Sequence, residues 1–96
     1  MRLMFAALLA AAVVGIAGLG GALSPAQAQS CNELWAERNG YYKDYGYCFR
    51  TQRAIQYFNG NAGCRYTNEG AIPFPPRIRA RINQIVRTER SLGCSG

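Results

Sequence analysis

The sequence predicts a small, mostly α-helical domain: three helices, with a long irregular loop before the third, stapled by two disulfides. Three observations support this fold class. The chain has 96 residues, which is enough for one domain. Its four cysteines all lie between residues 29 and 96. Apolar residues recur at helical spacing in three segments, and no segment shows the alternation typical of a strand.

Residues 1–28 have the organisation of a secretory signal peptide. Arg2 gives a positive start, residues 4–23 carry no charge, and Ala26-Gln27-Ala28 offers small residues at a cleavage site. The alternative is a membrane anchor, because about 20 apolar residues can cross a bilayer. The Ala and Gly content, the break at Ser24-Pro25 and the lack of a following basic cluster favour cleavage near Ala28. Residues 29–96 are then a secreted or periplasmic domain without a membrane span.

The cysteines Cys31, Cys48, Cys64 and Cys94 form an even set in a short exported chain, which predicts two disulfides. A zinc site would require closer spacing or histidine, and the chain has no histidine. If the first two helices form an antiparallel hairpin, the preferred pairing is Cys31–Cys64 with Cys48–Cys94. If the connection over residues 59–76 reverses the third helix, the pairing is Cys31–Cys94 with Cys48–Cys64.

The first predicted helix begins near Asn32, a suitable N-cap. It ends at Gly46, which suits a left-handed C-terminal cap. Between them, aromatic and other large side chains recur at helical spacing: Leu34, Trp35, Arg38, Tyr41, Tyr42 and Tyr45.

A second, short helix is predicted from Thr51 to Phe58, with Thr51 as its N-cap and the turn sequence Asn59-Gly60 after it. The third and clearest helix covers Arg77 to Leu92, preceded by Pro76 and ended by Gly93. Its apolar face consists of Ile78, Ile82, Ile85, Val86 and Leu92.

Residues 29–96 hold ten basic and five acidic residues, a net charge of +5. The third helix carries half of the basic residues, on a predicted basic surface: Arg77, Arg79, Arg81, Arg87 and Arg90. Such a surface could bind an anionic envelope component or an acidic protein, and outside the cytoplasm nucleic acid is not expected. The alternative is an ordinary solvated helix face.

No catalytic constellation is evident in the sequence. Histidine, the usual acid or base at neutral pH, is absent, and the cysteines are expected to be oxidised. Glu33 and Glu37 lie one helical turn apart, but a charged helix face explains them. We therefore expect no enzyme activity, no metal site and no cofactor.

The run from Leu34 to Phe49 resembles the YARHG domain of bacterial extracytoplasmic proteins. That family is named for a Tyr-Ala-Arg-His-Gly run that follows an Arg-Asn pair; Lys43, Asp44 and Tyr45 replace its three middle letters here. The chain looks like a cysteine-bearing branch of the family. The matching positions, called the motif residues below, are Arg38, Asn39, Tyr42, Gly46, Phe49, Tyr57, Phe58 and Glu89.

The resemblance implies a location outside the cytoplasm and a structural role for the motif residues. We expect Arg38 or Asn39 to anchor the turn at Gly46, and Tyr42, Phe49 and Phe58 to fill the core. The expected function is a small exported binding or structural module of the cell envelope. The alternative is a secreted inhibitor or toxin-like effector whose arginine helix engages an acidic partner.

Overall fold

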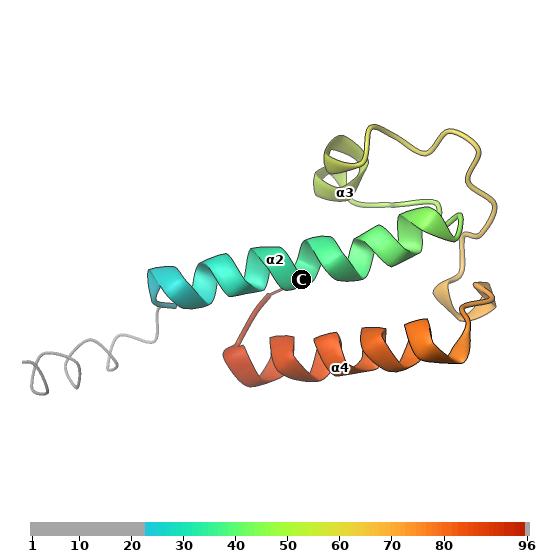
Figure 1. The fold of residues 1–96 in the computed structure, drawn as a ribbon. Helices are drawn as coiled ribbons and strands as arrows, with labels where there is room; N and C mark the ends of the chain where they lie inside the picture. The colour runs from blue at the N-terminus through green and yellow to red at the C-terminus, as the bar shows by residue number, and fades with distance from the viewer. Residues whose placement is uncertain (1–22, 96) are drawn as a thin grey trace, which may run out of the picture.

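The structure is a computed structural model that describes residues 23–95. The predicted signal peptide lies mostly outside these described residues. The chain forms helix α2 (Pro25–Asp44), helix α3 (Gln52–Tyr57), a 3-10 turn η2 (Glu69–Ala71) and helix α4 (Pro76–Leu92). In Figure 1, α2 and α4 run side by side and antiparallel, and α3 lies on the opposite side of α2 from α4. The predicted three-helix fold is confirmed.

Helix α2 begins earlier than predicted, at Pro25 rather than near Asn32. Ser24 is its N-cap: the Ser24 Oγ accepts from the Gln27 amide at 3.1 Å, and the Ser24 amide donates to Gln27 Oε1 at 3.0 Å. This reciprocal pair is a capping box, and proline is well suited to the first helical position. Ser24-Pro25 therefore starts a helix here. Predicted cleavage near Ala28 would remove residues 25–28 of α2 and leave Cys31 in place.

The two later helices begin and end as the sequence predicts. Thr51 caps α3, because its Oγ1 accepts from the Ala54 amide at 3.2 Å. Helix α4 starts at Pro76 and ends at Leu92. Its C-cap is Gly93, whose φ of 78° is left-handed and therefore favours glycine. The loop between them contains η2, which the sequence did not predict. Within residues 23–95, the only β-type pairing is an isolated parallel bridge between Tyr47 and Tyr66.

The core lies between α2, α4 and the segment that leads into α3. Its buried apolar side chains include Trp35 and Tyr42 of α2, Phe49, Ala54 of α3, and Ile82 and Ile85 of α4. Phe58 packs against this cluster and stacks on Phe49, with the ring centres 5.1 Å apart. Because aromatic rings bury large areas, they contribute strongly to the hydrophobic stabilisation of so small a domain.

Arg53 of α3 packs against α2 and forms a hydrogen bond with it. Its guanidinium carbon lies 3.8 Å from the centre of the Trp35 ring, and its Nη2 donates to Asn32 Oδ1 at 3.1 Å. Tyr57 meets the same tryptophan edge-on, with the ring centres 5.3 Å apart, and remains mostly exposed. Through these contacts Trp35 holds the short helix α3 against α2.

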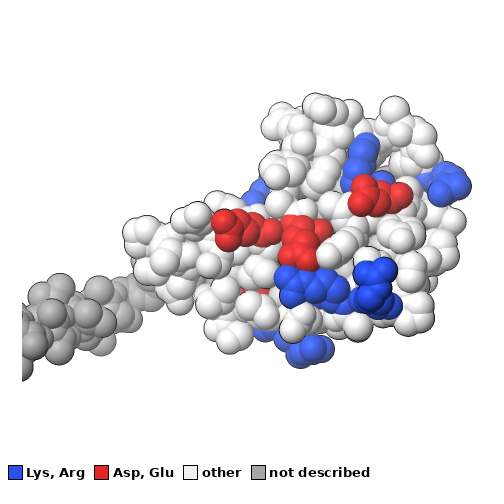
Figure 2. All heavy atoms as spheres, viewed as in Figure 1, with Lys and Arg blue, Asp and Glu red and all other residues white. Residues whose placement is uncertain are grey.

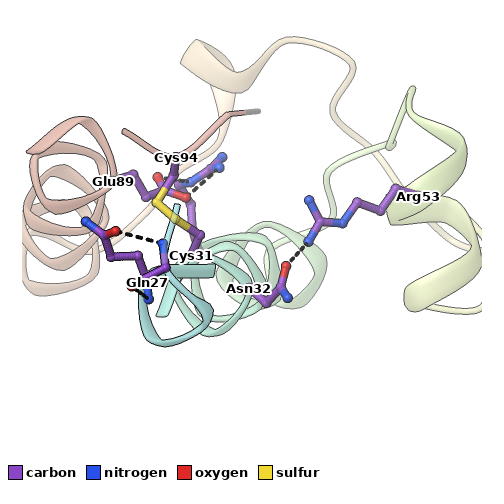
Figure 3. Close-up of a disulfide and its surroundings, with 8 residues drawn as sticks. Gln27, Cys31, Asn32, Arg53, Glu89 and Cys94 are labelled. Carbon is purple, nitrogen blue, oxygen red and sulfur yellow. Dashed lines mark hydrogen bonds and ion pairs between the residues drawn. A yellow bond between two sulfur atoms is a disulfide. The ribbon is translucent and has the colours of Figure 1, made fainter. Parts of the chain in front are cut away.

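The preferred disulfide pairing is wrong, and the alternative pairing is the observed one. Cys31 is bonded to Cys94, and Cys48 to Cys64. The reason is that α4 packs against α2, antiparallel to it, and not against α3. The C-terminal end of α4 therefore returns to the start of α2. Figure 3 shows the Cys31–Cys94 bond joining α2 to the segment after α4, with Glu89 beside it.

None of the described helices is long and apolar enough to cross a membrane.

Candidate functional site

Arg38 and Glu89 form a bidentate ion pair that joins α2 to α4. Arg38 Nε donates to Glu89 Oε1 at 2.9 Å, and Arg38 Nη2 donates to Glu89 Oε2 at 3.0 Å. The two side chains are only 15% and 11% exposed. Two parallel charge-assisted bonds are the strong form of this interaction, and they compensate for burying both charges. These two motif residues, 51 positions apart, therefore form one structural unit.

Asn39 and Tyr42 are buried next to this pair on α2. Asn39 Nδ2 donates to the Trp35 carbonyl at 2.9 Å, within the same helix. The Tyr42 hydroxyl donates to Glu69 Oε1 at 2.9 Å, which ties α2 to η2. Burial and this hydrogen bond raise the pKa of Tyr42 to about 12. Tyr42 thus stays protonated and keeps its donor throughout the physiological range.

The turn at Gly46 is held by backbone hydrogen bonds to Arg65 and Tyr66. The Gly46 carbonyl accepts from the backbone amides of Arg65 and Tyr66 at 2.7 and 2.9 Å. Gly46 has φ of 89°, and a Cβ there would lie 3.4 Å from the Arg65 side chain. The bonds described above direct Arg38 to Glu89 and Asn39 to Trp35. That Arg38 or Asn39 also anchors this turn stays a prediction.

The motif residues of α2 line a hollow in the surface, called the motif cleft here. Its volume is about 300 Å³, at the lower end of the range for small-ligand sites. Four of the eight motif residues line it, namely Arg38, Asn39, Tyr42 and Phe49, while Gly46, Tyr57, Phe58 and Glu89 do not. The other lining residues are Trp35, Tyr47, Arg50, Thr51 and Glu69. Arg50, Thr51 and Glu69 were not predicted as site residues.

A second bidentate ion pair joins the same two helices, but here the carboxylate is on α2 and the guanidinium is on α4. Arg81 of α4 donates to both carboxylate oxygens of Glu37 on α2, each at 2.7 Å, and the Tyr41 hydroxyl donates to Glu37 at 2.7 Å. Figure 2 shows acidic and basic side chains meeting on this face of the molecule. The Arg81 guanidinium lowers the pKa of Glu37 to about 2, and the carboxylate raises the pKa of Tyr41. Arg81 therefore does not belong to a free basic surface.

The Glu37→Gln variant is expected to reduce acid sensitivity. The folded pKa of Glu37 is about 2 and its ordinary value is 4.5, so the ionised carboxylate stabilises the fold above about pH 4.5. That stability is lost as the pH falls from about 4.5 to about 2. The melting temperature of the variant should fall less steeply across this window than that of the wild type. The side chains are 35% and 39% exposed, so solvent keeps the effect small. Parallel melting curves in the two proteins would contradict this role.

The other four arginines of the predicted basic surface, Arg77, Arg79, Arg87 and Arg90, are exposed. Arg79 Nη2 donates to the Ile72 carbonyl at 3.1 Å, and its guanidinium lies 5.4 Å from the centre of the Phe74 ring. Within residues 23–95, none of the four has a carboxylate partner. Among the described residues there is also no group of three side chains suited to hold a metal ion.

The fold and these contacts define a class of protein: a small helical domain stapled by two disulfides, with a charged pair from its sequence motif buried between the two long helices. The YARHG domain model matches residues 20–90, and the chain belongs to this family. No curated protein and no solved structure matches the chain. The disulfides and the family are consistent with a location outside the cytoplasm.

Proposed function

We propose that this protein is a non-catalytic binding module of the cell envelope, periplasmic or extracellular, exported by a signal peptide cleaved near Ala28. It binds a linear polyanion through α4. The supporting observation is an arginine stripe, defined as Arg79, Arg87 and Arg90, which are exposed and have no carboxylate partner in the described chain. The disulfides support the exported location, because they persist in oxidising compartments.

The geometry of the stripe suits an extended partner. At 100° per residue, the three arginines fall within about a quarter of the helix circumference, and they extend over roughly 16 Å of its axis. This flank is separate from the one on which Arg81 is bound to Glu37. A membrane surface is less suitable, because the large apolar side chains exposed in residues 23–95 are Leu23 and Tyr57, and neither is on α4.

Binding to polyphosphate should therefore be salt-sensitive and should depend on the stripe. Each exposed ion pair contributes roughly 0.2–1 kcal/mol, so the triple variant R79Q/R87Q/R90Q is expected to bind about tenfold more weakly at low salt. Its dependence on salt should also be shallower, because fewer counterions are released on binding. Titration by fluorescence anisotropy at several salt concentrations measures both quantities.

The matched control compares R77Q with R87Q. Both residues are exposed arginines of α4, but Arg77 lies outside the stripe, about 120° around the helix axis from its centre. We expect R87Q to weaken binding more than R77Q. Equal losses would point to a diffuse charge effect, and salt-independent binding would overturn the proposal.

A further inference from the structure

The motif cleft adjoins a second hollow of about 250 Å³ that shares Tyr47, Arg50 and Glu69 with it. The second hollow is completed by Thr67 and Asn68. The shared residues come from the segment after α2 and from η2, so the two hollows together extend from the buried side chains of α2 to these two loops. It is separate from the arginine stripe, none of whose residues lines either hollow.

Two unlike charges at the boundary of these hollows are available to a ligand. Arg50 Nη2 donates to the Thr67 carbonyl at 2.7 Å, and Glu69 Oε1 accepts from the Tyr42 hydroxyl at 2.9 Å. The ion pairs of the described chain join Arg38 to Glu89 and Arg81 to Glu37. Arg50 and Glu69 therefore pair neither with each other nor with another charged side chain of residues 23–95.

The inner wall of the motif cleft is mainly aromatic. Its arginine, Arg38, is already bound to the buried Glu89, and Asn39 is bonded within its own helix. Trp35, Tyr42, Tyr47 and Phe49 supply aromatic surface. The cleft thus combines one guanidinium and one carboxylate that lack charged partners with an aromatic wall. This arrangement is the complement of a small molecule that carries an amine, a carboxylate and an apolar portion.

We infer that the cleft binds a small zwitterion of the class of a free amino acid or short peptide, with its carboxylate on Arg50 and its ammonium group on Glu69. A polyanion would be repelled by Glu69. An uncharged sugar would desolvate Arg50 and Glu69 without giving either a charge, which is unfavourable. A zwitterion instead gives both side chains an opposite charge, and charge-assisted hydrogen bonds are about twice as strong as neutral ones.

The test uses alanyl-alanine as the probe and follows the backbone amide resonances of the full disulfide-bonded domain. Two analogues each remove one charge: N-acetyl-alanyl-alanine lacks the ammonium group, and alanyl-alanine amide lacks the carboxylate. The wild type should bind alanyl-alanine about tenfold more tightly than either analogue, since each loses one charge-assisted contact. The shifts should include Tyr47, Arg50 and Glu69. This comparison needs no variant and so is independent of folding.

Two variants then assign each charge. In R50Q the preference for the dipeptide over its amide should disappear, while the preference over the acetylated analogue remains; E69Q should show the reverse. Glutamine at position 69 keeps an oxygen that can accept from Tyr42, so the fold should persist. R77Q, a charge change outside both the cleft and the arginine stripe, should bind like the wild type.

Three results would overturn the inference: no shift at these residues with near-saturating dipeptide, equal affinity of the wild type for all three probes, or stronger binding of N-acetylglucosamine than of the dipeptide. None of these bears on polyphosphate binding by the arginine stripe, so the two proposals can fail separately.

Discussion

Replacing Arg38 with methionine is expected to lower the free energy of unfolding by about 3–5 kcal/mol, the usual cost of removing one partner of a buried ion pair. The variant leaves Glu89, whose side chain is 11% exposed, without the guanidinium that binds both of its carboxylate oxygens. A buried carboxylate without a cation is strongly unfavourable in a low-dielectric site. Urea denaturation of the disulfide-intact protein measures the loss.

The chain offers a matched control in the pair Glu37–Arg81. Both pairs are bidentate and both join α2 to α4, but the side chains of the second pair are 35% and 39% exposed. R81M should therefore cost much less than R38M, because water can solvate the carboxylate that remains. The double variant R38M/E89L should recover much of the stability lost in R38M, since no charge is left buried. Similar losses in R38M and R81M would contradict this account.

The two pairs also specify how the long helices align. Glu37 and Arg38 are adjacent on α2, and their partners Arg81 and Glu89 are eight residues apart on α4, or about 12 Å along the axis. Each helix carries one acidic and one basic member of these pairs. A shift of one helix along the other therefore separates at least one pair or brings like charges together. We infer that the pairs favour the observed alignment over others with similar apolar packing.

Local signals predicted most of the secondary structure. Thr51 at the start of α3, Gly93 after α4 and the apolar spacing along α4 each act over a few residues, so the sequence alone is sufficient. The start of α2 was misplaced because Ser24-Pro25 can either break a helix or begin one. The ambiguity is local, and the reciprocal bonds between Ser24 and Gln27 resolve it.

The disulfide pairing could not be predicted in this way, because it depends on which helix α4 packs against. A connection as long as residues 59–76 permits either direction. Charge complementarity was an available signal: Glu37 and Arg38 on one helix match Arg81 and Glu89 on another. Similarly, the motif identified Arg38, Asn39, Tyr42 and Phe49 of the cleft, whereas Arg50 and Glu69 lie in segments without periodicity and were missed.

Removing the Cys31–Cys94 disulfide with the variant C31S/C94S is expected to lower the free energy of unfolding by about 4 kcal/mol in the chain-entropy model. Its cysteines are separated by 63 residues, compared with 16 for Cys48 and Cys64. The shorter loop predicts a smaller loss, about 3 kcal/mol, for C48S/C64S. Urea denaturation of the three proteins under non-reducing conditions measures the order of stability.

The Cys31–Cys94 bond should also be coupled to the Arg38–Glu89 pair, because Cys94 and Glu89 lie at the same end of α4 (Figure 3). Their partners Cys31 and Arg38 are seven residues apart on α2. When the disulfide is absent, the end of α4 can separate from α2 and admit water to Glu89, so the cost of R38M should be smaller than in the wild-type background. Peptide mapping without reduction provides the control for connectivity and should recover Cys31 linked to Cys94. A Cys31–Cys64 link would contradict the packing of α4 on α2. Strictly additive losses would show that the disulfide and the ion pair stabilise the helix interface independently.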